Sequence, residues 1–251
     1  MSGHNKWSKI KHVKEAADAK KGAVYTKLIK EITAAAREGG GNVESNFKLR
    51  MFMTKAKEQN MPLDNVERAI KRGTGDLPGV ILETVNYEAY GPGGVAILID
   101  TLTDNKNRCS AEIKNILSKK GGNMAGAGSV SWMFSKKGSI MVDKAAAKED
   151  DLIALLDAGA EDVKSDDTTT YEVVTAAGNL EKVKNAMKAA NIPFTSAEVT
   201  MIPSSQVKVA GDAAKQLLTL IEALEEHDDV QNVYDNSDIP DEVLEQMEKE
   251  Q

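Results

Sequence analysis

The 251-residue chain is 41% hydrophobic and 4% aromatic, with a formal net charge of −7. This length exceeds one typical domain, so two or three domains are expected, with cores of Ala, Val, Ile, Leu and Met. No apolar run approaches the roughly 20 residues that a membrane helix needs, and the N-terminus lacks the apolar core of a signal peptide. The single cysteine, Cys109, excludes an intramolecular disulfide and suits a reducing compartment. These features predict a soluble, cytoplasmic protein.

The two parts of the chain carry opposite charge. Residues 1–75 contain 16 Lys and Arg and 8 Asp and Glu, a net of +8, whereas residues 76–251 contain 16 and 31, a net of −15. A basic segment joined to an acidic one predicts a polyanionic partner for the basic segment alone. The alternative is a solvated helical surface that is simply rich in lysine. The clustering without compensating acids favours binding.

Three helices are predicted after a Lys-rich arm of about 20 residues. An apolar stripe from Val24 to Ala36 marks the first helix, which ends at "GGG" because glycine accepts the left-handed conformation of a helix cap. Asn42 is expected to cap the second helix, and Gly73 to end the third. The short links predict a small antiparallel bundle. The side chains of the second helix that are expected to face inward are Phe47, Leu49, Met51 and Phe52.

Strands and helices alternate after residue 83. "TVNYEAY" alternates in polarity and "VAILIDTLT" begins as a continuous apolar run, so the second strand is expected to be central and buried on both faces. Pro92 and Gly93 suit a type II turn between them. A helix capped by Asn105 or Asn107 and ending at Gly121 follows. The remaining predicted elements are a hairpin of "SVSWMF" and "GSIMV", a helix "EDDLIALLDAGA", a strand "TTTYEVVTA", a helix "NLEKVKNAMKAAN", strands "TSAEVTMIP" and "SQVKVA", a helix "DAAKQLLTLIEALEEH" and a strand "VQNVYDN".

A weak internal duplication indicates how these elements are arranged. "YEVVTAAGNLEKVKNAMKAANIPFTSAEVTMI" and "VKVAGDAAKQLLTLIEALEEHDDVQNVYDN" both run strand, glycine, helix, strand, as in half of a split βαβ domain. The predicted fold class is α+β: an N-terminal three-helix bundle followed by two ferredoxin-like α/β domains, one inserted in the other. The expected divisions are a basic helical domain with its arm, 1–79; a discontinuous α/β domain, 80–129 and 204–240; an inserted α/β domain, 130–203; and an acidic tail, 241–251.

No arrangement of residues in the sequence predicts catalysis. His4 and His12 lie among lysines that would repel a metal ion, and no Cys and His ligand set accompanies them. His227 lies among carboxylates, where a solvated helix end is favoured over a cation site, and Cys109 is expected to be half-buried near a helix start rather than a reactive thiol. The stretches "GGNMAGAGS" and "KRGTG" lack the order and spacing of nucleotide-binding loops. We expect no enzymatic activity, no cofactor and no metal.

Several long blocks of the sequence resemble one family. They are "GHNKWSKIKHVKEAADAKKGAVYTKLIKEI", "PLDNVERAIKRGTG", "YEAYGPGGVAILIDTLTDNKNR" and "KKGGNMAGAGSVSWMFSKKG", in this order within the first 138 residues. In these blocks the chain resembles the YebC/PmpR family. The resemblance implies an N-terminal helical bundle and two α/β domains, one inserted in the other. It also implies a regulator of gene expression: bacterial members are labelled probable transcriptional regulators, some are linked to the ribosome and to proline-rich translation, and a mitochondrial relative is a translational activator of cytochrome oxidase.

Two positions depart from the pattern of that family. Val13 stands where members often have Arg, which removes one phosphate contact, and Cys109 stands where Thr is frequent, which argues against a thiol chemistry common to the family. The resemblance does not choose between DNA and RNA, and it implies no catalytic residue.

The Lys-rich N-terminal segment is the candidate nucleic-acid site. Lysine is a flexible point charge that neutralises phosphates and positions a protein without reading bases. Trp7 is expected either to stack on an unpaired base or to dock the arm onto the bundle. The candidate residues are Lys6, Trp7, Lys9, Lys11, Lys14, Lys20, Lys21, Lys27, Lys30, Lys71 and Arg72.

Two functions fit this site. One is a DNA-binding transcriptional regulator, which agrees with the usual label of the family. The other is a ribosome-associated translation factor that binds structured ribosomal or transfer RNA; the lack of a clear recognition helix and of a symmetric dimer motif favours it. A third alternative is a protein-interaction adaptor whose lysines only keep it in solution. The acidic domains are expected to repel nucleic acid or to bind a protein partner, and the sequence leaves the oligomeric state open.

Overall fold

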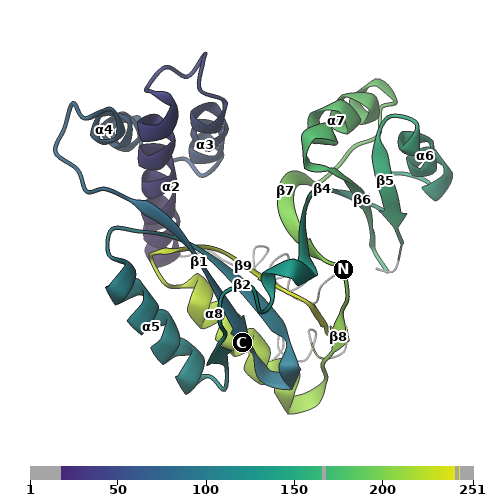
Figure 1. Ribbon diagram of the computed structural model, residues 1–251. Coiled ribbons are helices and arrows are strands. Elements are labelled where there is room, and N and C mark those ends of the chain that lie inside the picture. The colour runs from purple at the N-terminus through teal and green to yellow at the C-terminus, as the bar shows by residue number, and fades with distance from the viewer. Residues whose placement is uncertain (1–17, 166–167, 241–242, 244–251) are drawn as a thin grey trace.

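The computed structural model describes residues 18–165, 168–240 and 243, so the predicted acidic tail and nearly all of the arm lie outside the described residues. The chain is α+β, with helices first and then two antiparallel sheets that carry further helices (Figure 1). No helix of the described residues is both long enough and apolar enough to cross a membrane.

The first helices are α2 (Asp18–Gly39), α3 (Phe47–Glu58) and α4 (Leu63–Thr74). The longest of them, α2, packs against both α3 and α4. Tyr25 reaches from α2 to the end of α3, where its hydroxyl donates to the carbonyl oxygen of Asn60 at 2.9 Å. The core of these helices is buried apolar surface, made of Leu28, Ile32, Ala35, Leu49, Ala56, Met61, Val66 and Ala69.

The second helix starts later than predicted. Asn46 caps it rather than Asn42: its Oδ1 accepts from the backbone N–H of Leu49 at 3.0 Å, and its Nδ2 donates to the carbonyl oxygens of Ala35 and Gly40 at 2.8 Å. The Asn42 side chain instead accepts from the backbone N–H of Glu44 and so forms a turn before the helix.

Two side chains of α3 were expected to face inward and do not. Phe47 is 61% exposed and Met51 is 39% exposed. A short helix that packs against one neighbouring helix buries only one stripe of its side chains. In α3 this stripe is Leu49, Phe52 and Ala56, at intervals of three and four residues. Phe47 and Met51 fall outside that stripe, so the inward prediction is wrong for these two and right for Leu49 and Phe52.

The third helix continues through Gly73 to Thr74. Gly75 caps it, with a φ of +91° in the left-handed conformation. Gly73 is a buried contact point with α2. A Cβ atom there would lie 2.4 Å from the carbonyl oxygen of Thr33 and 2.7 Å from the Cβ of Ala36. The prediction that Gly73 ends the helix is therefore wrong: the residue serves close packing between the two helices.

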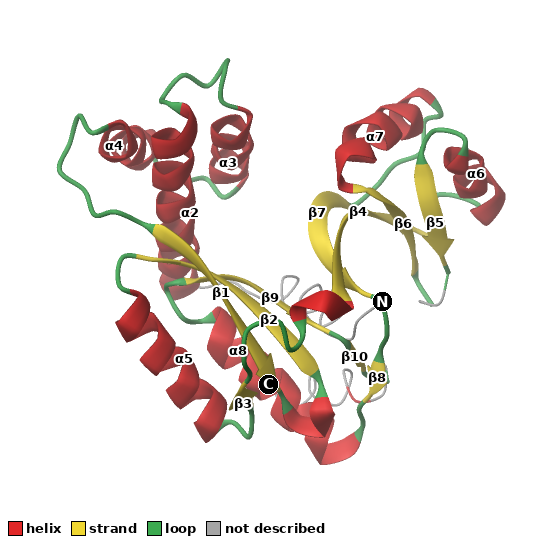
Figure 2. Ribbon diagram, in the orientation of Figure 1, coloured by secondary structure: helices red, strands yellow, loops and turns green. Residues whose placement is uncertain are grey.

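The first sheet has the strand order β3-β1-β2-β9 and is antiparallel throughout. Helices α5 and α8 cover one of its faces (Figure 2). The central strand β2 is buried along nearly its whole length, as predicted. The bounds are β1 (Glu83–Tyr90), β2 (Ala96–Thr103), α5 (Lys106–Lys119), β3 (Asn123–Met124), α8 (Gly211–Glu225) and β9 (Val230–Asp235).

Two local predictions in this sheet are confirmed. Between β1 and β2, Gly93 has φ 76° and ψ 6°, and the N–H of Gly94 donates to the carbonyl oxygen of Gly91 at 3.1 Å, as in a type II turn at Pro92 and Gly93. The short helix η1 (Pro92–Gly94) coincides with this turn. Asn105 caps α5, because its side chain accepts from the backbone N–H of Arg108.

The second sheet has the order β5-β6-β4-β7 and is also antiparallel. Its elements run strand, helix, strand, strand, helix, strand, which is the succession of a split βαβ arrangement. It occupies chain positions between β3 and α8 of the first sheet. The bounds are η2 (Ser131–Met133), β4 (Phe134–Asp143), α6 (Glu149–Ile153), η3 (Ala154–Leu156), β5 (Ala160–Lys164), β6 (Thr170–Ala176), η4 (Ala177–Asn179), α7 (Leu180–Ala189) and β7 (Ser196–Pro203).

The first sheet differs from the ferredoxin-like order that was predicted for both. Its hairpin β1-β2 lies in the centre, and the two-residue strand β3 takes the edge. The strand expected before α8 shrinks to β8 (Val207–Lys208), which pairs in parallel with β10 (Ser237–Asp238) in a separate small sheet. The resemblance between the two halves therefore holds for helix and last strand but not for the first strand.

The predicted hairpin at residues 129–142 is also wrong, because β4 is a single strand that follows the short helix η2. Gly138 does not turn the chain. A Cβ atom there would lie 2.5 Å from Thr175 Oγ1 and 3.1 Å from Leu180, so the glycine allows α7 and β6 to approach.

Candidate nucleic-acid interface

The predicted site residues divide into four groups by position: the arm, the start of α2, the middle of α2 and the end of α4. Lys20 and Lys21 lie in the first turn of α2. Lys71 and Arg72 form the last turn of α4, where positive charge interacts favourably with the helix dipole, and both are exposed. The arm residues lie outside the described residues; they are Lys6, Trp7, Lys9, Lys11 and Lys14.

Lys27 and Lys30 are turned toward the acidic part of the chain. The Lys27 ammonium donates to the carbonyl oxygen of Glu225 at 2.5 Å, and that of Lys30 donates to the carbonyl oxygen of Asp228 at 2.9 Å. Lys30 also pairs with the Asp229 carboxylate at 2.5 Å. These two lysines thus join α2 to the end of α8 and the turn after it. Lys71 and Arg72, by contrast, are exposed to solvent.

Helix α3 carries a basic surface that is not among the predicted site residues. Arg50 lies over the exposed Phe47 ring at 5.7 Å, and Lys55 lies over the Phe52 ring at 5.9 Å. Four of the twelve residues of α3 are basic and one is acidic, and this imbalance was the available signal. Lys48 pairs with Glu38 at 2.6 Å, and all four basic side chains of α3 are exposed cations of the kind that phosphates attract. The basic residues of α3 are Lys48, Arg50, Lys55 and Lys57.

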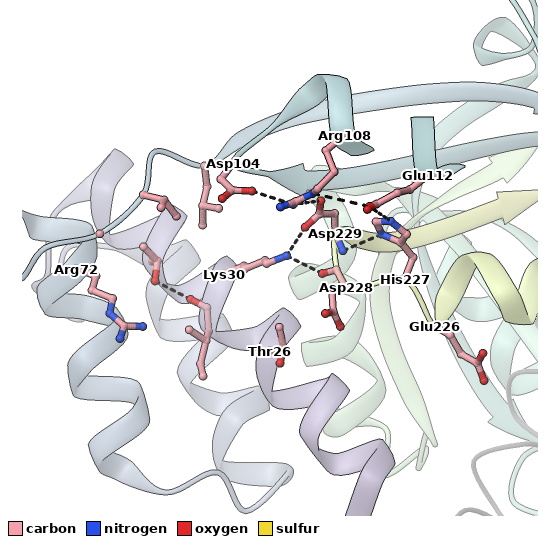
Figure 3. A pocket seen from close by; sticks show the side chains of 15 residues that line it. Thr26, Lys30, Arg72, Asp104, Arg108, Glu112, Glu226, His227, Asp228 and Asp229 are labelled. Atoms are coloured by element: carbon pink, nitrogen blue, oxygen red, sulfur yellow. Dashed lines mark hydrogen bonds and ion pairs between the residues drawn. The ribbon is translucent and has the colours of Figure 1, made fainter. Parts of the chain in front are cut away.

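A cleft of about 790 Å³ separates the N-terminal helices from the first sheet. Figure 3 shows Arg72 on the helical side, and Lys30 reaching across toward the charged residues of the sheet side. The sheet side comes from the start of α5 and from the turn between α8 and β9. The charged and histidine residues that line the cleft are Lys30, Arg72, Asp104, Arg108, Glu112, Glu226, His227, Asp228 and Asp229.

Asp229 is the centre of this cluster, and its side chain is 2% exposed. One carboxylate oxygen accepts from Lys30, and the other accepts from Arg108 Nη2 and from Thr103 Oγ1, both at 2.8 Å. Burial by itself would raise the pKa of Asp229, but the hydrogen bonds from these three groups outweigh it and lower the pKa to about 2. The arrangement is an ion-pair junction between the helices and the sheet.

His227 lies beside this junction. Its Nδ1 accepts from the backbone N–H of Asp229 at 3.1 Å, which places the ring proton on Nε2, 2.9 Å from a Glu112 carboxylate oxygen. Glu112, His227 and Asp229 offer ligand atoms within 4.8 Å of one another. Both Asp229 oxygens already accept from cations, and Lys30 and Arg108 would repel a metal ion. The donor set therefore suits the ion-pair junction better than a metal centre.

Cys109 lies in the first turn of α5 and is fully buried. Burial raises the pKa of its thiol, and hydrogen bonds with Tyr87 and Thr101 only partly offset this. A raised pKa leaves little thiolate at neutral pH, so the environment does not favour a nucleophile. A half-buried side chain was expected from the sequence, but Cys109 is completely buried.

Residues 5–76 match the description "TACO1/YebC protein N-terminal domain", and residues 82–237 match "TACO1/YebC second and third domain". The chain belongs to the TACO1/YebC family. This confirms the family that the four sequence blocks indicated. The TACO1/YebC proteins similar to this chain are named as probable transcriptional regulators, and the family is not one of enzymes.

Relatives in this family match the chain over nearly its full length. A "probable transcriptional regulatory protein" of Desulforapulum autotrophicum is 54% identical over 248 residues, which cover 98% of this chain and 100% of the relative. One of the same name from Natranaerobius thermophilus is 53% identical over 249 residues, with 98% and 99% covered. The crystal structure of the conserved hypothetical protein Aq1575 from Aquifex aeolicus has a TM-score of 0.76 and 40% identity, covering 89% of this chain and 92% of that one.

Proposed function

We propose that this TACO1/YebC protein is a regulator of gene expression that binds nucleic acid, with duplex DNA as its target, through the Lys-rich N-terminal module. The observation that carries the proposal is the separation of charge, +8 in residues 1–75 against −15 in the rest of the chain. A surface of this kind attracts a polyanion to one end of the molecule and repels it from the other. The names of the relatives support regulation of transcription.

The described helices support this placement of the contact. Lys71 and Arg72 end α4 as exposed cations, and the basic surface of α3 is exposed as well. The arm lysines Lys9, Lys11 and Lys14 belong to the same module and would add phosphate contacts. We expect Lys30 to contribute less to nucleic-acid binding than these residues, because its ammonium pairs with the Asp229 carboxylate.

Structured ribosomal or transfer RNA is the alternative target, and one feature of α4 favours it. The first two turns of this helix carry Asp64 and Glu67, whose charge opposes entry into a DNA groove. The guanidinium of Arg68 donates to Asn65 Oδ1 at 3.1 Å within the same helix, so both groups are engaged away from base edges. A ribosome-associated translation factor fits this alternative. A cytoplasmic location and a protein partner for the acidic part remain predictions.

The salt dependence of binding tests the proposal. Fluorescence anisotropy of labelled duplex DNA and of a labelled RNA hairpin is measured between about 50 and 200 mM salt, a range over which multiple phosphate contacts lose much affinity. Replacing Lys9, Lys11 and Lys14 together by Ala should flatten the log–log slope on DNA by about 2 to 3 units, since each contact contributes roughly 0.9.

A matched triple variant controls for loss of charge. Lys114, Lys119 and Lys148 are exposed lysines of the acidic part, and their replacement by Ala should leave the slope unchanged. Tighter binding of the duplex supports the DNA target, and tighter binding of the hairpin supports the RNA alternative. Equal slopes for wild type and the arm variant on both nucleic acids would remove the proposal and favour a protein-interaction adaptor.

A further inference from the structure

Trp132 is the most exposed large hydrophobic side chain among the described residues, at 70%. It lies in η2, between the first sheet and β4. Its indole Nε1 donates to the carbonyl oxygen of Ser129 at 3.0 Å, and the hydroxyl of the half-exposed Tyr90 donates to the same oxygen at 3.3 Å. The polar group of each ring is thus occupied within the protein. What Trp132 offers to a partner is its π-surface.

A buried carboxylate fixes the loop that carries Trp132. Glu88 is 9% exposed, and its oxygens accept from the backbone N–H groups of Gly128 at 2.7 Å, Val130 at 2.6 Å and Ser131 at 3.0 Å. Burial would raise the pKa of Glu88, but these three N–H groups outweigh it and lower the pKa, so the carboxylate is ionised. These charge-assisted hydrogen bonds from the loop of residues 128–131 to the buried Glu88 carboxylate hold the loop in this conformation.

Apolar anchors on both sides of Trp132 add to this rigidity. Val130 is fully buried and Phe134 is 6% exposed, and both pack against Ala96 and Leu98 of β2. The indole therefore stands out from a segment that is fixed before and after it. Little conformational entropy remains to be lost when a partner binds, which favours affinity.

The segment that carries the ring packs, through Val130 and Phe134, on the face of the first sheet opposite α5 and α8. The register pairs Asn86 with Asp100 and Asp100 with Asn232, so these side chains share that face, together with Tyr90. Lys136 of β4 is exposed and lies near enough to Asp100 to offset part of the pKa rise that burial causes there. Figure 2 shows η2 at the junction of the two sheets. One cation, one half-buried carboxyl group and two amide groups thus accompany the exposed aromatic rings.

These surroundings distinguish between classes of partner. Exposed or half-exposed Ser129, Ser131, Ser135 and Lys136 flank Trp132 in the chain, whereas a protein-docking surface would extend the apolar area around the indole. A base has a flat apolar face with polar edges, and it belongs to a strand of negative charge that Lys136 would attract. Stacking of an unpaired base on an aromatic ring is tolerant of sequence and contributes substantially to single-strand binding.

We propose that Trp132 is a stacking platform for an unpaired base of a nucleic-acid strand, with Lys136 beside the phosphates of that strand. The inference rests on the proposed binding of nucleic acid through the N-terminal module, and it adds a second contact outside that module, made to unpaired segments of a strand rather than to a duplex. It is also specific for unpaired bases, since a base within a duplex has no free face.

Anisotropy titrations of the full chain test this platform with a labelled single-stranded RNA, the single-stranded DNA of the same sequence, and the duplex DNA. Trp132→Ala should weaken binding of single strands roughly 10-fold, within the range for loss of one stacked base, and leave the salt slope unchanged. Trp132→Phe should retain most of the affinity. The matched control is Ile153→Ala, an exposed apolar residue of α6 at 46%, which should change nothing.

Intrinsic fluorescence gives a second readout. The chain has two tryptophans, so a Trp7→Phe variant leaves Trp132 as the reporter. Single strands should quench its emission, and duplex DNA should not. A preference for RNA or for DNA single strands identifies which source supplies the base.

Several results would overturn the inference. They are full affinity of Trp132→Ala for single strands, equal losses on duplex and single strands, or an equal loss in Ile153→Ala. If the arm variant still flattens the salt slope in those cases, the proposed function stands and the platform alone fails. If no nucleic acid binds the wild-type protein, both fail, and capture of a protein partner through Trp132 becomes the explanation of its exposure.

Discussion

Asp229 shows how a single carboxylate connects parts of the chain that are distant in sequence. It holds Lys30, 199 residues away, and Arg108, 121 residues away. The sequence shows Asp229 only as one acid in a group of four, and periodicity carries no information about which of them is buried. Asp228 beside it is exposed, whereas Asp229 is 2% exposed. This junction could not be predicted, because it depends on how the helices meet the sheet.

Asp229→Asn should destabilise the protein by about 2 kcal/mol at pH 7, which is the free energy that corresponds to lowering the carboxyl pKa from 3.8 to about 2. The amide keeps the shape but loses the charge that holds Lys30 and Arg108. Urea denaturation followed by circular dichroism measures the change. Asp228→Asn is the matched control and should stay within about 0.5 kcal/mol, as exposed positions do.

The same residue predicts a pH window. A carboxyl whose pKa is lowered by folding stabilises the native state above its unfolded pKa, and this contribution disappears as the pH falls through the native value. For Asp229 the loss should occur between about pH 4 and pH 2. Over this range wild-type stability should fall more steeply than that of Asp229→Asn. Parallel curves for the two proteins would show that the Asp229 charge is not linked to folding.

Individual helices and strands were largely predictable, and their contacts were not. The apolar run of β2, the type II turn and the Asn105 cap depend on local sequence, and all agree with the structure. Gly73 was interpreted as a helix end, and Gly138 begins the second strand of the hairpin that was predicted, yet both glycines serve close approach between elements. Glycine has the same local signature in both roles, so sequence alone could not separate them.

Helix α4 provides a prediction from that ambiguity. Gly73→Ala should destabilise the protein by about 2 kcal/mol, because its methyl group would overlap the carbonyl oxygen of Thr33 and force α4 away from α2. Gly22→Ala is the control: a Cβ atom there meets nothing within 4 Å, so the substitution should stabilise α2 by roughly 0.5–1 kcal/mol. Thermal unfolding of both variants decides the matter, and equal stabilities would refute the packing role of Gly73.

The candidate interface was predictable only in part. Clustering of lysine identified the N-terminal segment, and the structure exposes Lys71 and Arg72 there. It also directs Lys27 and Lys30 to the acidic part of the chain, which no count of charges could anticipate. Trp132 was missed because one aromatic residue in a Ser-rich stretch gives no periodic signal. Its significance comes from Glu88, which is distant in sequence and bonds the loop.

At the scale of the whole molecule, residues 1–75 and 76–251 carry opposite net charge. The N-terminal helices and the first sheet also have separate hydrophobic cores. The core over the first sheet consists of residues from 87 onward, and the core of the N-terminal helices consists of residues up to 70. The cleft between them is bridged at Asp229 by Lys30. The two hydrophobic cores therefore share no residue.

We expect that a fragment of residues 80–251 folds alone and binds duplex DNA poorly. Without α2, Asp229 keeps Arg108 and Thr103 but loses Lys30, so its pKa should rise toward the ordinary value and the acid transition should begin at higher pH. Circular dichroism should show cooperative unfolding. Affinity for duplex DNA should fall at least about 100-fold at low salt, because the lost module carries the phosphate contacts and the remainder is strongly acidic. A fragment that is unfolded would contradict the separation of the cores, and one that binds duplex DNA as tightly as the full chain would place the interface on the sheets instead.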